Sequence, residues 1–139
     1  MGWSVHYRAV IDGVVSEADR ALLAEQTQKW TSQLHEGSES YWWEVLDGEK
    51  AARIFGTYDL ATGGIVPAPI DPAKSYLWGF TKVQYSEDAT ADFCTMVTAV
   101  RELAEARPAW RITISDDYYL TEEVDPREVG DPEALVADG

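Results

Sequence analysis

Residues 3–11 read Trp3-Ser4-Val5-His6-Tyr7-Arg8-Ala9-Val10-Ile11, and this stretch decides the fold class. Every odd-numbered position carries an apolar or aromatic side chain, whereas Ser4, His6 and Arg8 occupy even positions. Successive side chains of a β-strand point to opposite faces, so the alternation predicts a strand that is buried on one side. The Asp12-Gly13 pair that follows predicts a turn.

Two amphipathic helices are predicted, one on each side of the middle of the chain. Ser16 is a good N-cap for a helix over 17–34, because acidic residues in its first turn complement the helix dipole. The second helix begins after Asp88 or Thr90 and ends before Pro108. Its apolar positions follow helical spacing and form one stripe: Phe93, Met96, Val97, Val100, Leu103 and Ala104.

Four further strands complete the predicted order β-α-β-β-β-α-β. They lie at residues 41–46, 51–58, 76–85 and 110–115, with Asp47-Gly48 as a hairpin turn between the first two. Residues 59–75, rich in glycine and proline, are predicted as a long irregular connection. Both helices need a shared apolar surface, so we expect an α+β fold: a mostly antiparallel five-stranded sheet with two helices on one face, a ferredoxin-like sandwich variant.

The length of 139 residues fits one domain, predicted at residues 1–125, followed by an acidic C-terminal extension at residues 126–139. A single cysteine, Cys94, cannot form an internal disulfide, which indicates a reducing compartment. The N-terminus lacks the pattern of a signal peptide, and the longest uncharged stretch is too short for a bilayer. We therefore expect a cytoplasmic protein without membrane association, and the absence of asparagine suggests a GC-rich bacterial genome.

The formal net charge of −14 is the largest compositional signal, and it is unevenly distributed. Residues 1–85 hold 11 acids and 7 bases, whereas residues 86–139 hold 14 acids and 4 bases. Such a field repels nucleic acid and anionic membranes and attracts basic proteins. The composition therefore argues against nucleic-acid binding and favours a basic protein partner.

The most distinctive local feature is an acidic run that encloses two tyrosines after the last predicted strand. Tyrosines serve as anchors in protein interfaces, and carboxylates there pair with arginine or lysine of the partner. The spacing lacks the D-x-D-x-D-G pattern of a calcium loop, which argues against a metal site, and a solvated acidic terminus is the plain alternative. The predicted partner-binding residues are Asp116, Asp117, Tyr118, Tyr119, Glu122, Glu123 and Asp125.

A second candidate site follows from strand parity, which places several bases and aromatic rings on the sheet face away from the helices. Such a surface suits an acidic or aromatic ligand. The alternative is that the bases pair with local carboxylates while the rings pack under residues 59–75. The predicted ligand-binding residues are Arg8, Arg53, Trp78, Lys82 and Arg111.

No catalytic, metal or cofactor signature stands out. His6 and His35 are the only histidines and belong to no zinc-binding spacing. A nucleophile triad of Ser115, His6 and Asp116 or Asp117 has nothing in the sequence to fix its geometry. We therefore expect a non-enzymatic binding protein without cofactor or metal that recognises a basic protein, the physical profile of an immunity protein or toxin inhibitor. The alternatives are a small-molecule-binding domain or modest enzyme, and an accessory subunit that dimerises through an exposed strand edge.

Overall fold

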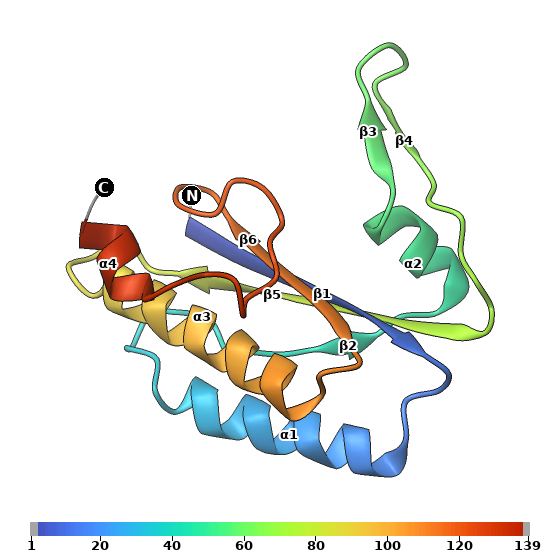
Figure 1. Ribbon diagram of the computed structural model, residues 1–139. Helices are drawn as coiled ribbons and strands as arrows, with labels where there is room; N and C mark the ends of the chain where they lie inside the picture. Colours follow the sequence, from blue (N-terminus) through green and yellow to red (C-terminus); the bar gives the residue numbers. More distant parts are fainter. Residues whose placement is uncertain (1–2, 138–139) are drawn as a thin grey trace.

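A computed structural model describes residues 3–137 of the chain, and a four-stranded antiparallel sheet in the order β2-β5-β1-β6 forms its centre (Figure 1). A separate two-stranded sheet pairs β3 with β4. In chain order the elements are β1 Trp3–Asp12, α1 Glu17–Thr31, β2 Glu44–Val45, α2 Gly48–Ile54, β3 Thr57–Asp59, β4 Gly64–Val66, β5 Lys74–Val83, α3 Ala89–Ala106, β6 Arg111–Asp116 and α4 Pro132–Ala137.

The sheet consists of two interleaved strand–helix–strand units. One unit consists of β1, α1 and β2, and the other consists of β5, α3 and β6. In the sheet, β5 lies between β1 and β2, and β1 lies between β5 and β6. This interleaving is that of the split βαβ motif. The central pair, β1 and β5, stays in register over ten residues, from Trp3 opposite Val83 to Asp12 opposite Lys74.

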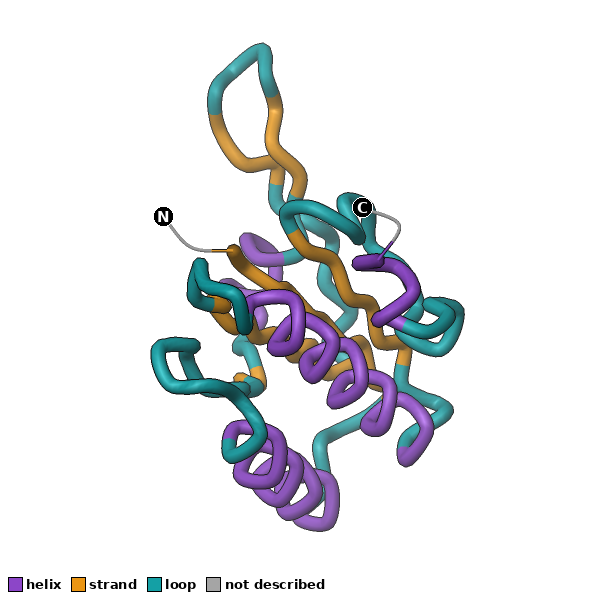
Figure 2. Tube along the Cα trace, turned by 90° about the vertical axis from the view of Figure 1, so that its left-hand side faces the viewer, coloured by secondary structure: helices purple, strands orange, loops and turns teal. Residues whose placement is uncertain are grey.

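Both long helices lie on the same side of the sheet, as Figures 1 and 2 show. The predicted apolar stripe of α3 is buried, and it packs on the odd-numbered side chains of β1. In contrast, α1 buries only Leu23 and Gln26, so most of its surface faces solvent. The core therefore lies mainly between α3 and the central strands.

The predicted α+β class and antiparallel sheet are confirmed, but the five-stranded, two-helix layout is wrong in detail. The main sheet has four strands, and Asp47-Gly48 begins α2 instead of turning a hairpin. The Asp47 carboxylate accepts a hydrogen bond from the backbone N–H of Lys50 at 2.8 Å, which is N-cap geometry. Ala51 and Ala52 favour a helix, so the first half of the predicted strand 51–58, residues 51–54, is helical.

Residues 59–75, predicted to be irregular, contain most of the β3–β4 hairpin. Tyr58 lies opposite Ile65 in its register, and the backbone N–H of Gly63 donates to the carbonyl of Asp59 at 2.8 Å. Gly63 has φ of 72°, a left-handed conformation that glycine adopts without a side-chain clash. The Gly63-Gly64 pair therefore closes a hairpin tip.

Residues 126–137, predicted to be part of an acidic extension, lie against α3 and are not detached from the domain. Pro126 is buried, and Leu135 is half-buried against the core. The guanidinium of Arg101 on α3 donates to the carbonyl of Pro126 at 3.1 Å, to that of Gly130 at 2.6 Å and to that of Val129. The last two residues of the predicted extension, 138–139, lie outside the described part of the chain.

Candidate functional site

The loop that follows β6 is organised by the buried carboxylate of Asp116, the first residue of the predicted partner-binding run. Asp116 is 5% exposed and accepts hydrogen bonds from four donors. These are the indole N–H of Trp3 at 2.7 Å and the backbone N–H groups of Tyr118 at 3.0 Å, Tyr119 at 3.1 Å and Leu120. Asp116 therefore shapes the loop from within and leaves little of its own surface exposed.

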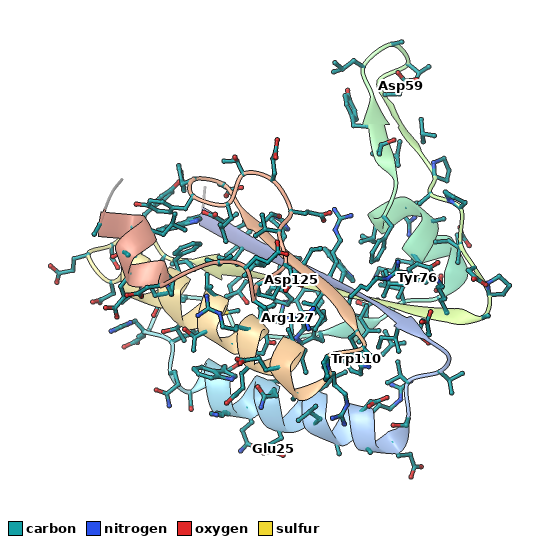
Figure 3. All side chains as sticks on the ribbon, viewed as in Figure 1. Glu25, Asp59, Tyr76, Trp110, Asp125 and Arg127 are labelled. Carbon is teal, nitrogen blue, oxygen red and sulfur yellow. The ribbon has the colours of Figure 1, made fainter. Side chains whose placement is uncertain are left out.

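Two further carboxylates of the run form ion pairs within the protein. Glu123 lies 3.0 Å from the Nε of Arg8, across the sheet face. Asp125 lies 2.8 Å from a guanidinium nitrogen of Arg127, whose hydrogen bond lowers the pKa of the Asp125 carboxyl (Figure 3). The negative charge of the run is thus partly neutralised by local arginines.

The two tyrosines of the run have different surroundings. Tyr119 is half-buried, with its ring centroid 5.3 Å from that of Phe93 in the core. Tyr118 is 54% exposed and packs edge-on against Trp3. Its hydroxyl forms a hydrogen bond with the hydroxyl of Tyr85, a residue that follows β5 and is 55% exposed. The fold therefore builds an exposed pair of tyrosines from two distant segments.

Three exposed carboxylates lie within four residues of Tyr85 or Tyr118 in the sequence and form no ion pair with any base among residues 3–137. Asp117 and Glu122 belong to the same loop as Tyr118, and Glu87 follows Tyr85 by two residues. The Asp117 carboxylate accepts a hydrogen bond from the backbone N–H of Ser4 at 2.8 Å, which fixes its position without neutralising it. We call these five residues the acidic tyrosine patch: Tyr85, Glu87, Asp117, Tyr118 and Glu122.

The bases of the alternative ligand site do not converge. Arg8 and Trp78 lie opposite each other on β1 and β5, on the sheet face away from α3. Lys82 lies opposite Ser4 and Arg111 opposite Val10, six residues apart along β1, which corresponds to about 20 Å of strand. Arg53, predicted on a strand, is instead exposed on α2. One small ligand cannot contact both Lys82 and Arg111.

The aromatic rings of this sheet face pack against one another. Trp42 lies nearly perpendicular to Trp78, at 5.4 Å between centroids, and to Phe80, at 5.2 Å. The guanidinium of Arg8 lies 5.3 Å from the ring of Phe55. The indole N–H of Trp78 is buried and has no hydrogen-bond partner in the part of the chain that the structure describes. The rings form a partly exposed aromatic layer in which they pack mainly against one another.

The residues of the conceivable triad come near one another without a catalytic geometry. Ser115 lies opposite His6 in the β1–β6 register. However, no hydrogen bond joins the side chain of His6 to Ser115 or Asp117, and the carboxylate of Asp116 is engaged on the buried side. A general base activates its nucleophile through a hydrogen bond, and the side chains of His6 and Ser115 do not form one. Burial lowers the pKa of His6.

His35 has a structural role. Its Nδ1 lies 2.7 Å from a carboxylate oxygen of Asp92, a fully buried residue of α3 that also accepts a 2.6 Å hydrogen bond from the Ser38 hydroxyl. The hydrogen bond to Asp92 raises the pKa of His35. Cys94 is half-buried, and burial raises the pKa of its thiol, the opposite of what a reactive cysteine requires.

Comparison with known proteins does not assign the chain to a family: no family model, curated protein or solved structure matches it. Within residues 3–137, no helix has both the length and the apolar character needed to cross a bilayer. The same residues contain no group of three or more His, Cys, Asp or Glu side chains placed to hold a metal ion. The acidic tyrosine patch, with its exposed tyrosine pair, is the candidate functional site.

Proposed function

We propose that this protein is a non-catalytic binding protein that recognises a cationic protein through the acidic tyrosine patch. The observation that carries the proposal is the exposed pair Tyr85 and Tyr118, set beside carboxylates that no described base neutralises. Tyrosine contributes a large rigid contact area and a hydroxyl, and it is enriched among residues that dominate binding energy. The unpaired carboxylates supply the complement to a basic surface.

Preorganisation of the loop supports a binding role. Asp116 accepts three successive backbone N–H groups, so the loop that carries Tyr118 and Glu122 is held in one shape before any partner arrives. A loop that is ordered in advance loses less conformational entropy on association, and this raises affinity. Of the rest of the predicted run, Asp116 holds this shape, and Glu123 and Asp125 form ion pairs within the protein.

The overall charge supports a cationic partner. A net charge of −14 attracts a basic protein over long distances and speeds its association at low ionic strength. This combination of an acidic surface and tyrosine anchors is the physical profile of an inhibitor or immunity protein that covers a basic target. Under this proposal, binding weakens as salt is raised.

The test is co-purification of the tagged chain from its native host at low and high salt, with retained proteins identified by mass spectrometry. We expect a basic protein to be retained at low salt. Tyr118→Ala should weaken its binding by about 30-fold, because an anchor residue contributes about 2 kcal/mol. Failure to retain any basic protein at low salt contradicts the proposal.

Glu122→Gln and Glu25→Gln form a matched pair for the charge contribution. Each removes one negative charge, but Glu25 is an exposed residue of α1, away from the patch (Figure 3). Only Glu122→Gln should weaken binding beyond the small general effect of net charge. Equal effects of the two substitutions would show that the partner responds to the total charge and not to the patch.

A further inference from the structure

A groove runs between α1 and the segment that leads into β2, and it contains no residue of the acidic tyrosine patch. The helix and residues 40–45 run in opposite directions along its two sides (Figure 1). At one end the Thr31 hydroxyl joins the two sides, because it donates to the carbonyl of Tyr41 at 3.3 Å and accepts the backbone N–H of Tyr41 at 3.1 Å. The groove, which we call the α1 groove, has a volume of about 670 Å³, and its lining includes Arg20, Leu23, Ala24, Thr31, Trp43 and Val45.

The walls of the α1 groove present mainly carbon atoms. Leu23 is buried, and Trp43 and Val45 are half-buried. The indole N–H of Trp43 donates to the hydroxyl of Tyr41 at 2.6 Å, so this polar atom is satisfied within the protein. Because α1 buries only one apolar side chain, the apolar surface between the helix and the sheet stays partly open. A cleft of this volume with an apolar lining and few polar groups is typical of small-molecule sites.

Arg20 is the only charged residue among the described residues that line the α1 groove, and it lies at the end where α1 begins. Its side chain is exposed and forms no ion pair with any acid in residues 3–137. The neighbouring carboxylate of Asp19 lies 2.9 Å from the Nε of Arg107 and is neutralised there. This strongly acidic chain therefore offers a free guanidinium and no carboxylate in the groove, and that charge selects an anionic ligand. A guanidinium binds a carboxylate through two parallel hydrogen bonds.

The positions of the lining residues along α1 set the shape of the ligand. Arg20, Ala24 and Thr31 lie on one face of the helix, because they are spaced by four and seven residues. The eleven residues from Arg20 to Thr31 correspond to about 16 Å of helix, at about 1.5 Å per residue. A ligand that fills this length has an elongated apolar body with its charge at one end.

We propose that the α1 groove binds an elongated aliphatic carboxylate, such as a medium-chain fatty acid. Its carboxylate pairs with Arg20, and its chain lies along Leu23, Val45 and Trp43. The net charge of −14 opposes an anion only at long range, because salt screens charges that are more than about 8 Å apart at physiological ionic strength. The inference does not rest on the proposed cationic partner.

Isothermal titration calorimetry of the full chain with sodium octanoate and sodium decanoate, each below its micelle concentration, tests the inference. We expect saturable binding of one molecule per chain. Decanoate should bind about 15-fold more tightly than octanoate, because each buried methylene contributes about fourfold. Absence of saturable decanoate binding, or equal affinity for the two acids, overturns the proposal.

Two substitutions that each remove one positive charge test the assignment of the carboxylate to Arg20. Arg20→Gln should weaken decanoate binding by at least about tenfold, because hydrogen bonds between charged groups are lost. Lys82→Gln is the matched control, since Lys82 is also exposed and in no ion pair among residues 3–137 but lies on the opposite face of the sheet. Equal effects of the two substitutions overturn the assignment.

Two exposed alanines of α1 locate the ligand. Ala24→Phe places a ring in the groove and should abolish decanoate binding, whereas Ala21→Phe changes a residue outside the lining and should leave it intact. Both substitutions carry the same loss of helix propensity, and circular dichroism confirms that both variants fold. Equal decanoate affinity in the two variants overturns the location. Tyr118→Ala should leave decanoate binding unchanged, so the two proposals fail separately.

Discussion

Replacement of Asp116 by alanine tests whether one buried carboxylate holds the candidate site together. Its four hydrogen-bond donors come from β1 and from three consecutive residues of the loop. Of these donors, Trp3 is 4% exposed and Leu120 is 9% exposed, so water cannot readily replace the lost acceptor. The N–H groups of Tyr118 and Tyr119 lie in a partly open loop that water can reach.

The expected cost follows from the two buried donors. Leaving a buried donor without an acceptor costs about 1–3 kcal/mol, so two such donors predict a loss of about 2–6 kcal/mol in the free energy of unfolding. This is a large share of the total for a domain of this size, which is about 5–15 kcal/mol. The loop should also lose its fixed shape, which would weaken binding at the acidic tyrosine patch without removing any of its residues.

Urea unfolding followed by circular dichroism measures this loss. Asp117→Ala is the matched control, because it removes an adjacent, exposed carboxylate with a single hydrogen bond to the backbone N–H of Ser4. We expect the control to cost less than about 1 kcal/mol. If both substitutions cost the same small amount, Asp116 does not organise the loop and the reasoning fails.

Two further predictions concern the core and the pH dependence of stability. Gly79→Ala should cost about 3 kcal/mol in urea unfolding, because its Cβ would overlap the carbonyl oxygen of Trp42; Gly48→Ala, with nothing within 4 Å, is the control and should be close to neutral. The hydrogen bond to Asp92 raises the pKa of His35 above its unfolded value of 6.5, so its contribution to stability is complete below pH 6.5 and is lost as pH rises through the higher folded-state pKa. The urea midpoint should fall in that window and His35→Gln should remove the dependence; an unchanged pH profile in the variant would contradict this.

Local patterns predicted the elements whose burial follows a simple period. The alternation at residues 3–11 specified β1 and its buried face, and the helical stripe after Asp88 specified α3. Around Asp47-Gly48 the same approach failed, because an aspartate before glycine suits both a hairpin turn and a helix N-cap. The choice depends on whether residues 51–58 have a neighbouring strand to pair with, which local sequence does not reveal.

The candidate site likewise combines features that the sequence predicted with features that only the fold produced. The acidic run and Tyr118 were visible in the sequence, but its members were expected to act together as a binding surface. The folded chain instead buries Asp116, pairs Glu123 with Arg8 and adds Tyr85 from another segment. Each of these outcomes involves a contact between residues more than thirty positions apart, from Trp3 to Asp116, from Arg8 to Glu123 and from Tyr85 to Tyr118, and no local period encodes such contacts.

By itself, the sequence determined the fold class, the strand β1, the helix α3 and the strongly acidic character, because these depend on residue type and spacing along the chain. Only the tertiary structure decided which carboxylates stay free, which tyrosines meet at the surface and that residues 57–66 form a separate hairpin. Those properties depend on the distances between segments, which are set when the sheet closes and the core excludes water.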